Sequence, residues 1–189
     1  MDAAAQYALA YALTTTAGVR AMLALTAVAV ATHFHVIHPP ATFGWLGSAP
    51  AMWILGALAI VEMLADKVPL LDHVLHFLQI AVKPAAGAIL VGGSVHAQSH
   101  DLLITLMILG ALNALGIHAA IASLRGASTI ATGGIANPAV STAEDAGSIG
   151  SLVLGFAAPF VAAALAVAFT LGLGFLALAA FRRVRAAAG

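Results

Sequence analysis

Long apolar runs alternate along this chain with short stretches rich in polar, glycine and proline residues. The runs at residues 21–37, 51–65, 102–124 and 160–181 approach or reach the ~20 residues with which a helix crosses a bilayer. Residues 3–13 are apolar but too short to cross alone, and the threonines and glycine at 14–18 weaken a helix locally. We therefore expect a half-helix that breaks at residues 16–18 and a separate span after it, in preference to one helix over residues 3–32.

Loops and prolines divide the rest of the chain. Residues 38–50 read as a loop, with Phe43 and Trp45 as interfacial anchors. Residues 70–82 predict an amphipathic helix that Pro84 ends. The apolar run at 146–181 would be ~54 Å long as one helix, which exceeds a hydrocarbon core of ~30 Å, so we expect Pro159 to divide it. The polar stripe of the amphipathic helix consists of Asp72, His76, Gln79 and Lys83.

The composition assigns this pattern to a membrane protein. The chain of 189 residues is 62% hydrophobic and 7% charged, against about 25% charged residues in soluble domains. We expect one all-α transmembrane helical bundle over residues 1–189, with about five to seven membrane segments, some broken or re-entrant. A net charge of zero gives no reason to expect nucleic acid as a partner. The chain has no cysteine, which excludes disulfides, thiol catalysis and cysteine metal sites.

The polar stretch at residues 129–145 is expected to form the functional site. Placing polar groups between membrane spans costs free energy unless they are buried in protein or line a water-filled cavity. Gly133 and Gly134 predict a tight turn. Asn137 precedes a proline and reads first as a cap or turn residue and second as a pore-lining donor. Ser141 or Thr142 is expected to start a helix that has Glu144 in its first turn, with the Glu144 carboxylate near main-chain N–H groups of that turn or close to a basic side chain.

Ionisable side chains at membrane depth cost about 2.5–3.5 kcal/mol each on insertion and tend to be paired and functional. We favour buried roles for Glu62 and Glu144, and an interfacial position for Asp72 and Lys83. We also expect the two halves of the chain to pack face to face, which would bring residues 62–66 close to residues 129–145. The expected ion or solute site consists of Arg20, Glu62, Asp66, Arg125, Thr132, Asn137, Glu144 and Asp145.

The eight histidines raise the question of a metal site. The spacings of His73 with His76 and of His96 with His100 suit metal binding on a helix, but structural or interfacial histidines are the preferred interpretation. His118, in the middle of a span, is of interest as a titrating group. The chain carries no motif for nucleophilic catalysis, phosphate binding or dinucleotide binding, so we expect neither an enzyme nor a cofactor.

An internal repeat is faintly visible. Glu62 with Asp66, and Glu144 with Asp145, are each followed by an apolar stretch and then by a proline, Pro84 or Pro159. Paired broken helices at matching places are typical of the inverted repeats of transporters. The sequence therefore suggests repeats at residues 3–97 and 101–182.

Three segments together resemble a family of small bacterial membrane proteins, the domain-of-unknown-function family 4126. The resemblance covers nearly the whole chain and implies a bacterial membrane protein of one domain, without implying any chemistry. The first segment is residues 17–20, the second is residues 61–69 with 71–73 and 83–84, and the third, the most specific, is residues 132–138 with 141–144.

The leading functional hypothesis is a small transporter or channel-like protein for an ion, proton or small polar solute, because carboxylates lie beside interrupted helices. The alternatives are a structural or assembly protein without transport activity and, third, a membrane enzyme with a histidine-bound metal. The lipid bilayer is the expected partner, and a homo-oligomer is left open. Arg182, Arg183 and Arg185 predict a cytoplasmic C-terminus in the bacterial inner membrane.

Overall fold

The computed structural model describes residues 1–65, 67 and 69–188, without the side chains of residues 69–76, 177, 180, 181 and 183–188. This part of the chain is helical and contains no strand, which confirms the all-α prediction. The elements are α1 (Ala3–Val19), α2 (Ala21–His33), the 3-10 helix η1 (Ala41–Gly47), α3 (Ala49–Ala65), α4 (Pro69–Ser94), α5 (His100–Thr132), α6 (Asn137–Ala157) and α7 (Pro159–Ala188).

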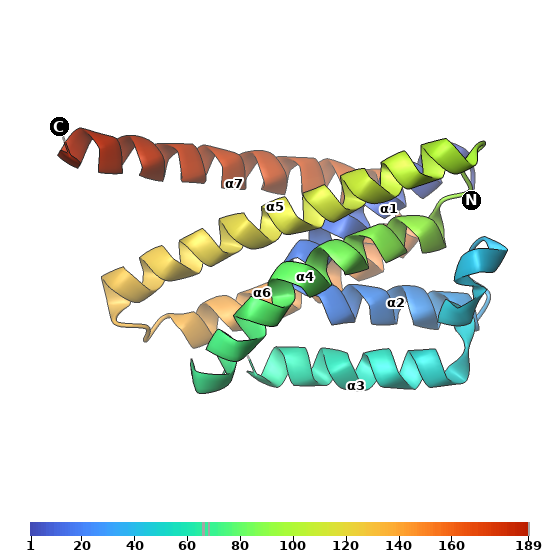
Figure 1. Cartoon of the computed structure of the whole chain (residues 1–189), viewed down its shortest axis with the longest axis horizontal. Helices are drawn as coiled ribbons and strands as arrows, with labels where there is room; N and C mark the ends of the chain where they lie inside the picture. The colour runs from blue at the N-terminus through green and yellow to red at the C-terminus, as the bar shows by residue number, and fades with distance from the viewer. Residues whose placement is uncertain (66, 68, 189) are drawn as a thin grey trace.

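Helices α1 and α2 form a hairpin in the middle of the bundle. The predicted break lies at Arg20 (φ −134°, ψ 89°), later than the expected residues 16–18. The threonines do not interrupt α1, because the hydroxyls of Thr14 and Thr16 donate to main-chain carbonyls one turn earlier. The chain reverses at Arg20, so that the start of α1 and the end of α2 lie at the same end of the molecule (Figure 1).

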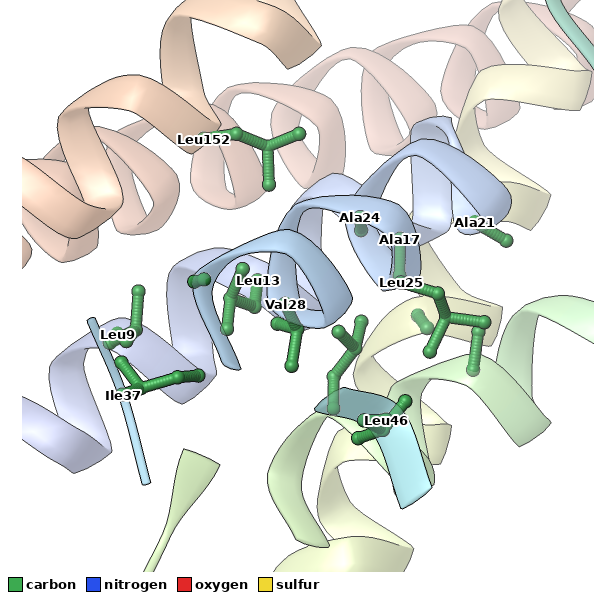
Figure 2. Packing of buried hydrophobic residues seen from close by; sticks show 14 residues of the cluster. Leu9, Leu13, Ala17, Ala21, Ala24, Leu25, Val28, Ile37, Leu46 and Leu152 are labelled. Atoms are coloured by element: carbon green, nitrogen blue, oxygen red, sulfur yellow. The ribbon is translucent and has the colours of Figure 1, made fainter. Parts of the chain in front are cut away.

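The hydrophobic core surrounds this hairpin. Leu9 and Leu13 of α1 and Val28 of α2 are almost completely buried, and they pack with Leu46 of η1 and Leu152 of α6 (Figure 2). Alanines at the inner positions of α1 and α2 let the neighbouring helices approach closely. The hairpin is therefore apolar on most of its surface because other helices cover it.

Helices α4 and α5 pack side by side across one face of the hairpin (Figure 1). The expected break at Pro84 is wrong, since α4 continues through this residue, although Figure 1 shows the helix bending along its length. The apolar run at 102–124 lies within a longer helix, since α5 begins at His100 and runs on to Thr132. A Cβ atom added to Gly87 would lie 2.4 Å from the carbonyl oxygen of Gly110, so glycine is needed where the two helices meet.

The polar stretch at residues 129–145 is mostly helical, in contrast to the expected loop. Only residues 133–136 form the turn between α5 and α6, and Gly133 (φ 63°) and Gly134 (φ 86°) have the left-handed backbone expected of them. Helix α6 begins at Asn137, with Pro138 in its first turn, where the missing N–H has no consequence. At its other end, α6 stops at Ala157 and α7 begins at Pro159, which confirms the predicted division.

Three helical segments are long and apolar enough to cross a membrane: Phe77–Ser94, His100–Thr132 and Pro159–Leu176. The pair η1 and α3, bent by 65°, would make a fourth if it counts as one broken span. The described residues thus provide three to four candidate spans, and the expected number of five to seven is not confirmed. Large apolar side chains on α3, α5 and α7, such as Trp53 and Phe175, are exposed, as in helices that face lipid.

Candidate functional site

Two charged side chains cap the two helix ends that meet at Arg20. The Glu62 carboxylate accepts hydrogen bonds from the main-chain N–H groups of Ala21 and Met22, at 3.0 Å each, at the start of α2. The Lys83 ammonium donates to the carbonyls of Gly18 and Val19, also at 3.0 Å each, at the end of α1. Each charge has the sign that the adjacent helix dipole favours, and both side chains are at most 5% exposed.

Arg20 connects the tip of the hairpin to α6. Its guanidinium is buried, and its Nε lies 2.6 Å from Oδ1 of Asp145. Its Nη2 donates to the hydroxyl and the carbonyl oxygen of Ser141, at 3.0 and 3.2 Å, and lies 3.5 Å from a carboxylate oxygen of Glu144. A buried charge with this many partners fixes the position of the hairpin tip relative to α6.

Two further cations complete the ion-pair network. Lys67, after α3, places its ammonium 2.6 Å from Oδ2 of Asp145. Arg125 of α5 holds Glu144 with both Nε and Nη2, and the Nε–Oε1 distance is 3.0 Å. Among the described residues the cluster thus contains four cations, Arg20, Lys67, Lys83 and Arg125, and three carboxylates, Glu62, Glu144 and Asp145.

A polar pocket of about 160 Å³ lies within this network. Its described lining includes three cationic side chains, Arg20, Lys83 and Arg125, and a single carboxylate, Glu144. Its neutral polar lining consists of Gln79, His118, Thr129 and Asn137. A pocket of this volume has room for several water molecules or one small solute.

Asn137 contributes an amide to the pocket wall. Its Nδ2 donates to the hydroxyl of Thr129 at 2.8 Å, so that the side chain bridges α5 and α6. Its Oδ1 is buried without a hydrogen-bond partner among the described residues. Asn137 therefore lines the polar pocket, and the expected side-chain cap is not found, because no side chain caps α6.

A second, larger cavity of about 570 Å³ lies beside the polar pocket, between α1, α5, α6 and α7. Its wall is largely apolar, with Leu154, Phe169 and Leu173 among the lining residues. The two cavities share Val19, Ile121, Arg125 and Glu144. The Arg125–Glu144 ion pair therefore belongs to the wall of both.

Most of the expected site residues converge. Arg20, Arg125, Asn137, Glu144 and Asp145 belong to the network or the pocket. Glu62 lies next to them and accepts hydrogen bonds from two N–H groups at the start of α2. Thr132 does not join them: it is exposed at the end of α5, and its hydroxyl donates to the carbonyl of Ser128 one turn earlier. Asp66 lies outside the described residues.

Two expected positions are wrong. Glu144 does not lie at a helix N-terminus, because α6 already begins at Asn137, although its carboxylate does lie close to basic side chains, those of Arg20 and Arg125, as expected. Lys83 does not lie at an interface but is 3% exposed, because the helix ending at Val19 offers it two unpaired carbonyls. Asp72, also expected at an interface, belongs to the part of α4 whose side chains are not described.

The histidines do not form a metal centre in the part of the chain that the structure describes. No group of three or more histidine and carboxylate side chains there could hold a metal ion. His96 and His100 are exposed near the start of α5, and the side chains of His73 and His76 lie outside the description. His118 is buried and lines the polar pocket.

Sequence reasoning missed Gln79 and Ser141 as members of the site. Gln79 is 8% exposed and lines the pocket one turn before Lys83. The polar stripe of α4 carried this signal, since positions i and i+4 share one helix face. Ser141 is fully buried against Arg20, and no sequence signal distinguished it from a helix cap.

Comparison with known proteins gives a family without a described activity. No curated protein and no solved structure matches the chain. A family model described as Domain of unknown function (DUF4126) matches residues 7–179, which is most of the chain. The chain therefore belongs to the DUF4126 family of proteins, as its sequence motifs indicated.

Proposed function

We propose that this protein is a small membrane transporter, and not an enzyme, and that its solute is a small anion. The observation that carries the proposal is the lining of the polar pocket, whose described part contains the cationic side chains of Arg20, Lys83 and Arg125. Guanidinium and ammonium groups in a low-dielectric wall are hydrogen-bond donors that suit a negatively charged solute. The sequence suggested carboxylates as cation or proton sites, but Glu62, Glu144 and Asp145 are each held by protein donors.

The broken helix around Arg20 supports a transport role. Discontinuous helices in transporters place their free ends at a central site, where main-chain groups and helix dipoles act on the solute. Here the junction of α1 and α2 lies beside the polar pocket, and both Val19 and Arg20 belong to its lining. We propose that the α1–α2 hairpin is re-entrant and supplements the three to four candidate spans.

Glu144 has the position of an exchangeable counter-ion. It accepts hydrogen bonds from Arg125 and lies 3.5 Å from Arg20, at the wall of the pocket. An entering anion could replace Glu144 as the partner of one of these guanidinium groups. Both guanidinium groups would then still have an anionic partner. Such an exchange would lower the desolvation cost of binding a charged solute.

An internal inverted repeat remains part of the proposal. The junction residues Arg20 (φ −134°, ψ 89°) and Ala158 (φ −148°, ψ 73°) have similar backbones, and each donates its N–H to a carbonyl four residues earlier. This similarity supports repeats within residues 3–97 and 101–182. Pro84 does not support them, because it lies inside a continuous helix whereas Pro159 starts one. We further propose the bacterial inner membrane as the location and a homo-oligomer as the working form.

The test is the swelling of proteoliposomes in isosmotic potassium salts, followed by light scattering. Valinomycin supplies potassium permeability, so the swelling rate reports the permeability of the anion. We expect protein-dependent swelling that varies among chloride, nitrate, acetate and phosphate. Swelling that follows the cation and ignores the anion, or that equals the rate of protein-free liposomes, would refute the proposal.

Gln79→Leu is the informative variant for this assay, because Gln79 lines the pocket without belonging to the ion-pair network. We expect it to slow anion-dependent swelling about tenfold or more, through loss of a polar group that solvates the anion. Gln98→Leu, at an exposed position between α4 and α5, is the matched control and should swell as the parent does. An unchanged rate in Gln79→Leu would contradict the assignment of the pocket as the pathway.

A structural or assembly role is the second candidate. The observation that favours it is that Glu144 and Asp145 are paired with arginine, which is how a scaffold would satisfy its carboxylates. A scaffold predicts no anion-dependent swelling in the parent protein. It also predicts that Gln79→Leu leaves every measurable property unchanged except stability.

A further inference from the structure

We propose that the polar pocket selects an oxyanion that carries a hydrogen of its own, and that it rejects anions of similar size that only accept hydrogen bonds. The ligand class is a hydrogen-bearing oxyanion, either inorganic, such as phosphate, or a small hydroxy acid, such as glycolate. The inference rests on the proposed function for the negative charge of the solute. It adds the O–H group by which the pocket distinguishes one anion from another.

Asn137 places an acceptor of fixed orientation in the pocket wall. The hydroxyl of Thr129 donates to the carbonyl of Arg125 at 2.9 Å, so its single hydrogen is already used. The 2.8 Å hydrogen bond between Thr129 and Asn137 is therefore donated by the NH₂ group of Asn137. A reversed amide would set two acceptors against each other, which fixes the side-chain amide as it stands.

The oxygen of the same amide needs a donor. Oδ1 of Asn137 is buried and has no hydrogen-bond partner in the described part of the chain. A buried polar atom normally has a partner in protein or solvent. Because Asn137 lines the pocket, an O–H group of a bound solute can supply the missing hydrogen. An anion without hydrogen would instead bring a second acceptor to this oxygen.

Gln79 is an independent indication that the pocket takes a polar ligand. It lines the pocket from α4 and is 8% exposed, and its amide forms no hydrogen bond within the residues that the structure describes. A glutamine amide can turn either its oxygen or its NH₂ group to a ligand. Gln79 therefore suits an anion with or without a hydrogen, and the selection between the two falls to Asn137.

The charged lining residues do not make this selection. Arg20, Lys83 and Arg125 have partners within the protein, and as donors they would attract every anion alike. The pocket of about 160 Å³ has room for one tetrahedral oxyanion. Phosphate and sulfate share this shape, and only phosphate carries a hydrogen at neutral pH. Comparing the two anions therefore isolates the contribution of the O–H group.

The experiment measures binding of radiolabelled phosphate and of radiolabelled glycolate to the full chain in detergent, by scintillation proximity at constant ionic strength in methanesulfonate. We expect saturable binding of at least one label, and the label that binds identifies the source of the O–H group. Sulfate should compete with phosphate, and acetate with glycolate, at least about tenfold more weakly than the unlabelled parent anion. Equal competition by the hydrogen-free anion, or no saturable binding of either label, would overturn the proposal.

Thr129→Val assigns the selection to Asn137. The variant removes the hydroxyl that holds the Asn137 NH₂ group, so the amide can turn either end to the solute. We expect the hydrogen-free anion to compete within about threefold of the hydrogen-bearing one in this variant. Gln79→Leu should weaken the binding of both anions by a similar factor, because its amide serves either of them.

Thr105→Val is the matched control for Thr129→Val. Thr105 is also an exposed threonine of α5 whose hydroxyl donates to a carbonyl one turn earlier, and it lies outside both cavities. It should keep the full difference between the two anions. Full selection in Thr129→Val, or an equal loss of selection in Thr105→Val, would overturn the role of Asn137.

The swelling assay separates this inference from the proposed function. Selective binding of the hydrogen-bearing anion without anion-dependent swelling retains the site and refutes transport. Anion-dependent swelling with equal binding of phosphate and sulfate retains transport and refutes the selection.

Discussion

At the scale of single residues, the chain places opposite charges at the two helix ends that meet inside the protein. Glu62 serves the N-terminus of α2 and Lys83 serves the C-terminus of α1. Four orphan main-chain groups are satisfied by two side chains, which matters where water is scarce. Glu62 and Lys83 are therefore engaged in structural hydrogen bonds that limit their ability to bind a solute, in contrast to Arg125 and Glu144.

Glu62→Gln tests how much the cap at the start of α2 contributes to stability. The amide keeps one acceptor oxygen and presents an NH₂ group to the second main-chain N–H, so one buried donor loses its partner. We expect the free energy of unfolding to fall by about 1–3 kcal/mol, measured by thermal or SDS-induced unfolding in mixed micelles. Asp101→Asn, at an exposed carboxylate in the first turn of α5, should change it by less than about 0.5 kcal/mol. An equal change in the free energy of unfolding in the two variants would show that the Glu62 cap stabilises the protein no more than an exposed carboxylate does.

The Arg125–Glu144 pair makes a different prediction, because it is held more loosely at the cavity wall. The side chains are 18% and 12% exposed, so solvent screens the pair in part. A double-mutant cycle with Arg125→Gln and Glu144→Gln should give a coupling of about 0.5–2 kcal/mol in unfolding. A coupling near zero would mean that Arg20 takes over Glu144 when Arg125 is removed.

At the scale of helices, close packing depends on glycines at the crossing points. A Cβ atom at Gly18 of α1 would lie 2.4 Å from Cβ of Ile117 in α5, a separation that real Cβ atoms do not show. Gly87 and Gly110 make a similar contact between α4 and α5. The hairpin tip and Lys83 reach each other only because these helices lie so close together.

Gly18→Ala and Gly87→Ala should therefore each destabilise the protein by about 1–3 kcal/mol, because main-chain and Cβ atoms at the contact have little room to move. Gly116→Ala, in α5 with no atom within 4 Å of the added carbon, should be neutral or stabilise by up to about 1 kcal/mol through helix propensity. The measurement is the unfolding midpoint of the three variants in one detergent. Destabilisation by Gly116→Ala equal to that of Gly18→Ala would remove the packing argument.

The sequence predicted the elements that depend on local chemistry and missed those that depend on tertiary contacts. The division at Pro159 and the glycine turn at 133–134 follow from backbone propensities. The break before α2 was predicted at residues 16–18 and lies later, at Arg20. Pro84 was expected to end a helix, but packing of α4 along α5 keeps the helix continuous. The sequence predicted that the charged residues around Arg20 form one site. It did not predict which groups bind each other, because Glu62 and Lys83 bind the free main-chain groups where α1 ends and α2 begins, and a sequence pattern does not show where those helix ends lie.

At the scale of the whole molecule, the charges are unevenly distributed between its two ends. Figure 1 shows the C-terminus and the turn between α5 and α6 at one end, and the N-terminus, η1 and the connection from α4 to α5 at the other. The chain has seven lysines and arginines, and none lies in residues 1–19, 34–48 or 95–99, the segments at the second end. Those segments, with the first turn of α5, carry Asp2 and Asp101.

This asymmetry predicts the orientation in the membrane. Arg182, Arg183 and Arg185 follow the last span directly, and the positive-inside rule places such clusters in the cytoplasm. The turn at residues 133–136 would then also face the cytoplasm, because it lies at the same end of the molecule as the C-terminus (Figure 1). The connection from α4 to α5 would face the opposite side.

Cysteine labelling with a membrane-impermeant maleimide measures this orientation without background, because the native chain has no cysteine. Gln98→Cys, in the connection from α4 to α5, should be labelled in intact cells. Ile135→Cys, at a turn position that is 86% exposed, should be labelled only after the cells are permeabilised. Both positions are accessible, so a difference between them reports sidedness and not burial. The reverse pattern would place the arginine cluster outside, and the polar pocket would then face its solute from the opposite side of the membrane.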